Sequence, residues 1–372
     1  MPSVSNFTAK RKFSIFNFQF SIKSMNKFVF SVCLFLFSLA GFAQGSTLVE
    51  AEEDSTISVI AYFCKNDSLV YDYWHVKNRI KEADTVTTVN VTTRFLVTVT
   101  DSTSEGYKMV LVPQSIEKGE TTHSDEALKM EDLLTMPLGV NCRFSTDELG
   151  VIQHIDNWME IRDSLKTNYK KIFDEVYAQN AGLDSILPRQ RMESTFLLRC
   201  SSESGILQIY APLVMLFNVH GGSFAMKKDH LETKNELGYP THIDIEAFYT
   251  VPKEDTDNEG DYAIVAETTT DMKGDDLMDM VGGAVGMMVN DSIAGKLNET
   301  LKSDEFAKME VQGLNHELYT FFYNGWPKMM VSEKKVGIDG KDALIEAAGL
   351  EWVSLHWNEY AEEEDDGEKQ DI

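Results

Sequence analysis

The sequence predicts an α+β fold, in which a large curved antiparallel β-sheet, open like a half-barrel or a clam, is covered by a central group of helices. The first observation is a near-strict alternation of apolar and polar residues over positions 89–100, which is the period of a strand with one dry face and one wet face. The second is that the alternation resumes at 107–111, after turn-forming residues at 101–106. The third is an apolar pattern of helical spacing at positions 158–176.

The N-terminal third is predicted to form strands and hairpins. Residues 85–112 contain the long hairpin, whose continuous apolar face requires a cover. A shorter hairpin is expected where Gly150 ends a turn between two apolar runs. The other expected elements are strands at 56–63, 69–80, 141–145 and 151–155 and a short helix at 127–134.

Helices are expected in the middle of the chain. Asn157 suits the N-terminal cap of a helix that ends near Gly182, and the apolar stripe of this helix should lie on the dry face of the sheet. Pro188 is placed to begin a second helix. Residues 206–217 form a third apolar segment, which Pro212 interrupts.

Strand patterns return after Gly221, and Asn324-Gly325 predicts a hairpin turn. Residues 341–348 are expected to form a short helix. The expected strands lie at 223–226, 231–237, 242–251, 262–269, 309–312, 318–323 and 329–336.

The N-terminus has the parts of a secretory signal peptide: a basic region, the apolar run 28–42, and small residues before the expected cleavage between Ala43 and Gln44. The run is about 15 residues, shorter than the ~20 that span a bilayer. We therefore expect an exported protein, soluble in the periplasm or outside the cell, with no transmembrane span after cleavage. The sequence leaves open whether translation starts at Met1 or Met25.

The remaining chain is long enough to bury a large core as one domain. The predicted boundaries are an N-terminal extension and signal peptide at 1–43, a single α+β domain at 44–360, and a disordered acidic tail at 361–372. An alternative division has two β-rich halves, 44–156 and 218–340, joined by helices at 157–217.

The chain is strongly acidic. It holds 60 acidic and 34 basic residues, for a formal net charge of −26. The first 43 residues contain five basic and no acidic side chains, so their removal leaves 29 basic against 60 acidic, a net charge of −31. Such a surface repels nucleic acid and anionic membranes, so we expect neither as a partner.

Three cysteines follow the expected cleavage site: Cys64, Cys142 and Cys200. An odd number allows at most one internal bridge, and their apolar neighbours favour buried thiols. The sequence leaves the formation of a disulfide open. No Cys-x-x-Cys pair or Cys/His metal spacing is present, and no cofactor is expected.

No familiar catalytic motif is present, whether the Gly-x-Ser-x-Gly turn, the His-Glu-x-x-His metal motif or a phosphate-binding loop. His220-Gly-Gly-Ser is interpreted as a loop rather than an oxyanion site. His242, Asp244 and Glu246 share one strand face, since positions i and i+2 point the same way. They could form half of a metal site, but wet-face residues are the favoured interpretation and no metal site is predicted.

The most unusual stretch is rich in methionine and glycine, at residues 275–301. Methionine adapts to varied surfaces and glycine weakens helices. The functional hypothesis is a mobile flap over an apolar ligand, with the ligand-binding residues Met278, Met280, Met287 and Met288. The alternative, which the sequence favours, is a packed helix with small residues at close contacts.

Several local patterns resemble an uncharacterised family of exported Bacteroidota proteins. They are the aromatic strand 69–80, Phe144-Ser-Thr-Asp147 followed by Leu149-Gly150-Val-Ile, the helix that leads into Gly221-Gly-Ser-Phe224, and Asn324-Gly-Trp-Pro327. The resemblance spans most of residues 56–337 and brings no known activity or site residues. Strands with one apolar face beside amphipathic helices also resemble periplasmic half-barrel carriers of lipidated cargo, by analogy of fold.

The leading hypothesis is an exported, non-enzymatic binding protein that holds an apolar small molecule or another envelope protein against its sheet. One alternative is a hydrolase whose site is built from scattered histidine and acidic residues; another is a structural envelope component. No catalytic residue is predicted. A large apolar cavity would favour the first, convergent histidines and carboxylates the second, and a solid core the third.

Overall fold

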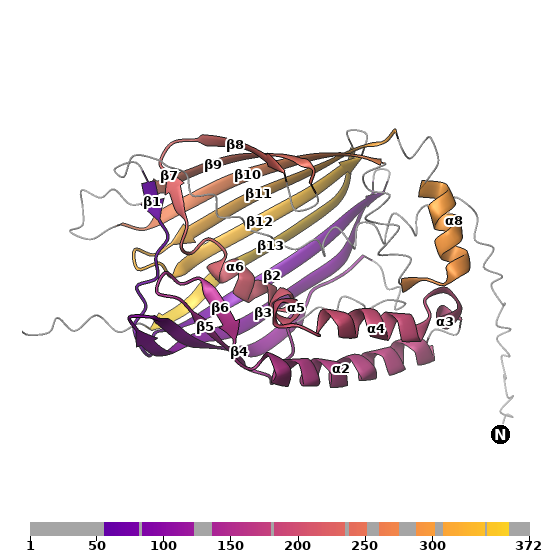
Figure 1. Ribbon diagram of the computed structural model, residues 1–372, viewed down its shortest axis with the longest axis horizontal. Coiled ribbons are helices and arrows are strands. Elements are labelled where there is room, and N and C mark those ends of the chain that lie inside the picture. Colours follow the sequence, from indigo (N-terminus) through magenta and orange to yellow (C-terminus); the bar gives the residue numbers. More distant parts are fainter. Residues whose placement is uncertain are drawn as a thin grey trace, which may run out of the picture.

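The computed structural model describes residues 56–81, 84–122, 136–179, 182–234, 238–250, 260–274, 288–301, 308–338 and 341–356. It contains one large curved sheet, with helices packed against one of its faces (Figure 1). The expected cleavage between Ala43 and Gln44, the expected helix 127–134 and the expected tail 361–372 lie outside the described residues.

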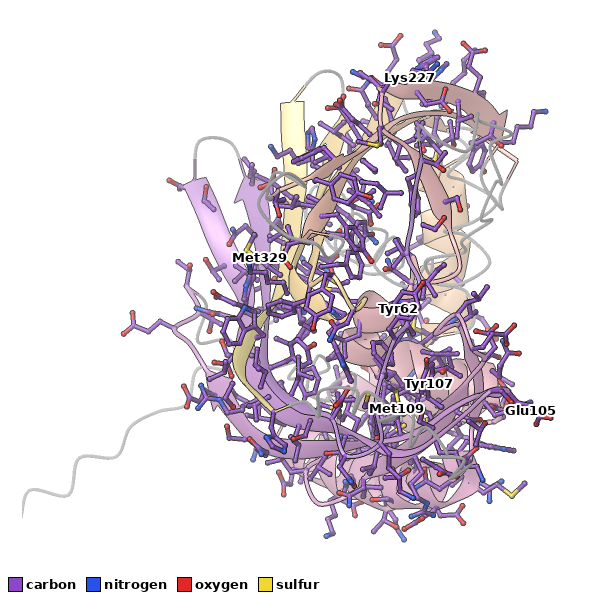
Figure 2. The ribbon with its side chains drawn as sticks, turned by 90° about the vertical axis from the view of Figure 1, so that its left-hand side faces the viewer. Tyr62, Glu105, Tyr107, Met109, Lys227 and Met329 are labelled. Carbon is purple, nitrogen blue, oxygen red and sulfur yellow. The ribbon has the colours of Figure 1, made fainter. Side chains whose placement is uncertain are left out.

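Within the described residues the main sheet has eleven strands, and each neighbouring pair is antiparallel. In order across the sheet they are β6 (Ile152–Ile155), β5 (Cys142–Thr146), β4 (Gly106–Lys118), β3 (Asp84–Thr103), β2 (Ser68–Lys81), β13 (Lys341–His356), β12 (Pro327–Ile338), β11 (Glu310–Phe321), β10 (Tyr262–Lys273), β9 (Pro240–Tyr249) and β8 (Asp229–Lys234). A separate ribbon pairs β1 (Thr56–Ser58) with β7 (Ser223–Ala225). Figure 2 shows the curvature of the sheet, whose described strands do not close into a barrel. The predicted α+β class is confirmed.

The long hairpin consists of β3 and β4, as predicted. Phe95 and Val97 of β3 are fully buried, and Val97 lies opposite the buried Leu111 of β4. We call the face that carries these side chains the inner face of the sheet. Gly106, which ends the turn, has a φ of +138°, and a Cβ there would lie 2.1 Å from the carbonyl oxygen of Thr146. The turn therefore requires glycine.

The expectation of a helix at 341–348 is wrong, because these residues belong to β13. This strand pairs with β2 on one side and β12 on the other, so it joins an early strand to a late strand of the described chain in the centre of the sheet. Glu346, Ala347 and Ala348 favour helices locally, but two flanking strands satisfy the backbone of β13 and override that preference. The two expected strands at 309–312 and 318–323 are likewise one continuous strand, β11.

The predicted central helices are present. They are α2 (Trp158–Gln179), α3 (Leu183–Ile186), α4 (Arg189–Arg199), α5 (Glu203–Ile209) and α6 (Ala211–Phe217), and α8 (Asp291–Leu301) follows later in the chain. Asn157 precedes α2, although its side-chain oxygen accepts the backbone N–H of Arg143 at 2.8 Å rather than capping the helix. Pro188 precedes α4, and Pro212 lies in the first turn of α6.

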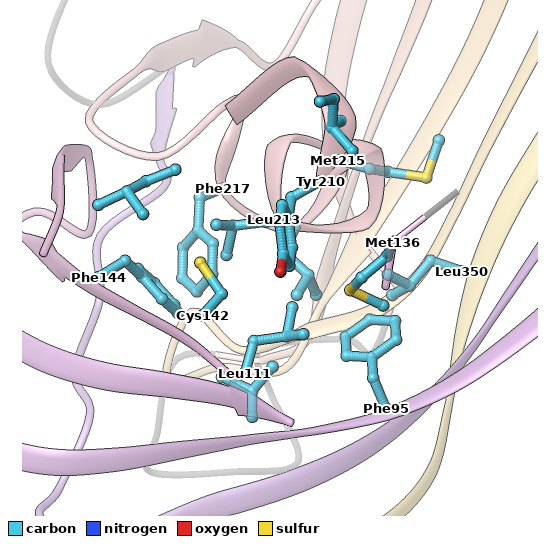
Figure 3. Close-up of a cluster of buried hydrophobic side chains, with 14 of the residues drawn as sticks. Phe95, Leu111, Met136, Cys142, Phe144, Tyr210, Leu213, Met215, Phe217 and Leu350 are labelled. Carbon is cyan, nitrogen blue, oxygen red and sulfur yellow. The ribbon is translucent and has the colours of Figure 1, made fainter. Parts of the chain in front are cut away.

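Helices α2, α4, α5 and α6 cover the inner face at the β2–β6 end of the sheet (Figure 1). Tyr169 and Phe173 of α2 each hold their ring centroid 5.6 Å from that of Phe196 in α4. Phe217 of α6 lies 5.5 Å from Phe144 of β5 in the same way. Figure 3 shows side chains of α6 and of the sheet pointing into one shared cluster. This apolar cluster is the main core.

Cys142 and Cys200 are buried, Cys64 is half-buried, and no disulfide joins these three residues of the described chain. Burial raises the pKa of the Cys142 thiol to about 12, with a smaller contribution from the charge of Asp156. The prediction that cysteines pack as buried thiols therefore holds for Cys142 and Cys200. Among the described residues, no helix has both the length and the apolar character to cross a bilayer.

Candidate functional site

The inner face of the sheet changes from apolar to charged partway along its central strands. On β2, Leu69 and Tyr71 are fully buried in the main apolar core. The next inner-face positions of this strand are Tyr73, His75 and Lys77. Lys77 is only 6% exposed, which is uncommon for a lysine unless the protein supplies partners for its charge.

Three strands contribute one charged side chain each to a single row, which we call the charged row. The strand register places Lys77 of β2 opposite Glu346 of β13, and Glu346 opposite Lys334 of β12. The Nζ atom of Lys77 lies 3.9 Å from Oε2 of Glu346. His75, on the next inner-face row, has its Nε2 atom 2.8 Å from Oε1 of the same carboxylate. Glu346 therefore lies between two lysines and a histidine.

The electrostatics of the charged row favour an ionised carboxylate. Burial alone raises the pKa of Glu346, but the hydrogen bond with His75 and the nearby Lys77 and Lys334 outweigh burial and lower that pKa to about 2. Burial also lowers the pKa of the Lys334 ammonium, although Glu346 and Glu317 oppose this shift. The row thus holds ionised groups in an environment that would otherwise disfavour charge.

Apolar clusters flank the charged row on both sides along the strands. On the side of the helices, Leu350 and Met330 belong to the main core and are fully buried. On the other side lies a second cluster, whose buried members are Met272, Val311, Val336 and Leu344. A polar band between two apolar surfaces can recognise a molecule that has both kinds of surface.

Of the four predicted flap residues, one lies within the part of the chain that the structure describes. Met278, Met280 and Met287 fall outside the described residues, so the flap stays a prediction. Met288 is described, is 6% exposed and packs into the main core.

His220 is a buried structural residue. Its Nε2 atom lies 3.0 Å from the carbonyl oxygen of Gly325, and its ring stands between those of Phe217 and Phe321. Burial lowers the pKa of His220 to about 4 despite this hydrogen bond. The segment connects α6, which ends at Phe217, to β7, which begins at Ser223, in agreement with its interpretation as a loop.

The three polar residues of β9 singled out by the sequence, His242, Asp244 and Glu246, share the outer face of the sheet, as i and i+2 spacing predicts.

The sequence did not reveal the charged row, because its members come from strands far apart in the chain. One pattern could have suggested it: the alternation on β2 passes from Leu69 and Tyr71 to His75 and Lys77 without changing face.

No protein-family model matches this chain, and none of the curated proteins matches it. Among solved structures, the chain is similar to one described as lipid–protein interactions in lipovitellin, with 8% identity and a TM-score of 0.33, over 80% of this chain and 26% of that one. It is also similar to an outer membrane channel from Pseudomonas putida F1, with 7% identity and a TM-score of 0.20, over 82% of this chain and 100% of that one. This chain thus spans about a quarter of the lipovitellin chain. At these TM-scores neither similarity indicates a function.

Proposed function

We propose that this protein is an exported, non-enzymatic carrier that binds an amphipathic ligand, with an acyl chain and an anionic head group, on the inner face of its open sheet. The observation that carries the proposal is the charged row. The buried Lys77 and the half-buried Lys334 lie on the inner face of the sheet, between two apolar clusters. The lysines would bind the head group and the apolar clusters would contact the chain.

The uneven helix cover supports this assignment. In Figure 1 helices α2, α4, α5 and α6 gather over the β2–β6 end, and none of the described helices crosses the middle of β8–β11. The inner-face side chains Leu231, Ile243 and Ile245 of the latter strands are only half-buried. When a ligand removes half-buried aliphatic side chains from water, the free energy of the complex falls by roughly 25 cal/mol per Å² of apolar surface buried.

The sign of the head group follows from the local charges. The whole chain has a net charge of −26, yet Lys77, Lys334 and Arg79 gather on the inner face, against Glu346 and Glu317. These side chains carry one more positive than negative charge. The anions on the rest of the surface affect the site little, because surface charges are screened within about 8–10 Å. An anionic head group is therefore favoured over a cationic one.

One observation favours the hydrolase alternative: His75 and Glu346 form a histidine–carboxylate pair. Such a pair activates a nucleophile only when the second imidazole nitrogen reaches it. Among the described residues, the hydrogen bond of His75 runs to Glu346, and the neighbouring Ser332 hydroxyl donates instead to Asn315 at 3.1 Å. The carrier assignment is therefore preferred.

Native mass spectrometry of the protein purified from its own envelope tests the proposal. The expected result is one retained acyl lipid with an anionic head group per chain. A bare protein mass, after gentle transfer conditions that preserve a known lipid carrier, would exclude tight binding. Retention of a neutral lipid would keep the carrier and reject the role of the lysines.

A further inference from the structure

The outer face of the sheet, opposite the charged row, carries a compact group of imidazoles and carboxylates at its β8 edge. His230 and Glu232 are two positions apart on β8 and so share a face. The register places His230 opposite Asp244 of β9 and Glu232 opposite His242. Pairing alone therefore brings four potential metal-binding or metal-supporting side chains together on two strands.

The side-chain geometry of three of these residues converges. One ligand atom each from His230, Glu232 and His242 lies within 4.8 Å of the others. The Oε1 atom of Glu232 is 3.8 Å from Nε2 of His230 and 3.8 Å from Nδ1 of His242. Zinc bonds of about 2.0–2.1 Å in a tetrahedral site place ligand atoms roughly 3.3 Å apart, so small side-chain rotations close the remaining gap.

Asp244 supplies a second and independent feature. Its Oδ1 atom accepts a hydrogen bond from Nδ1–H of His230 at 2.6 Å, and the Nζ atom of Lys228 lies 2.6 Å from Oδ2. A carboxylate acceptor fixes the proton of His230 on Nδ1. The Nε2 atom, 3.8 Å from Oε1 of Glu232, then keeps its lone pair for a metal ion. Metal-binding histidines are typically held by such a carboxylate on the other ring nitrogen.

We propose that His230, Glu232 and His242 bind one zinc ion, and that Asp244 orients His230. Two imidazoles and one carboxylate suit borderline divalent ions, whereas Ca²⁺ and Mg²⁺ prefer sites made of oxygen ligands. The three side chains are solvent-exposed, so water completes the coordination. The ion would join the edge strand β8 to β9 and lies on the face opposite the proposed lipid site.

The same face offers an internal control. His316 of β11 and Glu267 of β10 form a pair, with Nδ1 of His316 3.3 Å from Oε2 of Glu267. His316 is as exposed as His242, at 44% of its side chain in both cases. His316 is not a member of the three-ligand group. A substitution there removes an equally exposed imidazole without touching the proposed site.

The test uses the full chain without a histidine tag, titrated with Zn²⁺ by calorimetry and with Co²⁺ by visible absorption. One ion per chain is expected. His242→Ala and Glu232→Gln should each weaken binding at least tenfold, whereas His316→Ala should leave it unchanged. Asp244→Asn should weaken binding about 10- to 100-fold while one ion per chain is retained.

Three outcomes overturn the proposal or part of it. Absence of binding at about 100 µM Zn²⁺, or equal effects of His242→Ala and His316→Ala, rejects the site. An unchanged affinity in Asp244→Asn rejects the orienting role. Thermal melting in EDTA shows that each variant is folded. It should be unaltered in Glu232→Gln, His242→Ala and His316→Ala, because these side chains are exposed.

Discussion

The indole Nε1–H of Trp326 donates a hydrogen bond of 3.3 Å to the carboxylate of Asp67, which lies 259 positions earlier in the chain. The same carboxylate oxygen accepts the backbone N–H of Cys64 at 2.8 Å. Both partners are buried, at 0% and 1% exposure for Trp326 and Asp67. Asp67 immediately precedes β2 and Trp326 immediately precedes β12, so this bond fixes the two strands that enclose β13.

Loss of the Asp67 carboxylate should destabilise the fold strongly. Asp67→Ala leaves the buried indole N–H of Trp326 and the part-buried backbone N–H of Cys64 without this acceptor. We expect a loss of about 2–4 kcal/mol in the free energy of unfolding. Asp67→Asn keeps an acceptor oxygen and should lose less. Asp101→Ala is the control, since this exposed residue pairs with Lys65 only at 3.6 Å. Urea denaturation measures all three, and equal losses in Asp67→Ala and Asp101→Ala would contradict the role of the bond.

Gly325 should tolerate alanine far less well than Gly139. Both adopt a left-handed conformation, with φ of +81° and +82°, so both substitutions incur the backbone cost of about 1–2 kcal/mol. A Cβ at Gly325 would additionally lie 2.1 Å from the carbonyl oxygen of Ile60, whereas the space around Gly139 is open for 4 Å. Thermal melting should show a clearly larger loss for Gly325→Ala. Similar melting temperatures would mean that the segment at Ile60 moves away freely.

The charged row should make stability depend on acidity. The pKa of Glu346 is lowered from 4.5 to about 2, so the folded protein binds this proton less readily than the unfolded chain. Ionised Glu346 therefore stabilises the folded state by up to about 3 kcal/mol. This stabilisation is fully present above pH 4.5 and is lost as the pH falls towards 2. Glu346→Gln should therefore flatten the decline in unfolding free energy between pH 5 and 2. Glu351→Gln, on the exposed outer face of β13, should retain it.

Removal of the positive charge of Lys334 should weaken the binding of an anionic ligand much more than that of a neutral ligand. The probe is cis-parinaric acid, a fluorescent fatty acid, and its methyl ester serves as the neutral counterpart. Lys334→Met should weaken binding of the acid at least tenfold, about 1.4 kcal/mol, and should change binding of the ester little. Its neighbour Lys335 has the opposite orientation on β12 and pairs with Glu333 at 2.7 Å. Lys335→Met should therefore behave as the unaltered protein, and equal weakening of acid and ester would exclude a head-group role.

The sequence predicted those parts of the fold that obey a simple local period. Phe95 and Val97 alternate with polar residues, and the hairpin of β3 and β4 follows from that pattern. The period fails where the inner face becomes polar: Asn315 on β11 and Glu346 on β13 occupy inner-face positions that a pattern search assigns to water. For this reason the sequence pattern predicts two strands where β11 is continuous, and a helix where the structure has β13.

The candidate sites depend on which strands lie side by side, and the alternation within one strand does not encode this. Lys77 and Glu346 become neighbours only because β13 inserts beside β2. The partnership of His242 with Glu232 likewise depends on how β8 pairs with β9. Alternation shows which residues share a face of one strand, but it contains no information about the partner strand. One candidate, the methionine-rich segment, was visible in composition, and its role remains a prediction.

The position of β13 has a consequence for synthesis. His75 can bind Glu346 only after a further 271 residues have been synthesised. At 5–20 residues per second, that interval is roughly 14–54 s. Throughout it β2 presents an open backbone edge, the kind of surface on which strands of other chains add. The nascent chain is therefore most vulnerable to intermolecular pairing before β13 emerges, and a holding chaperone would be most useful in that interval.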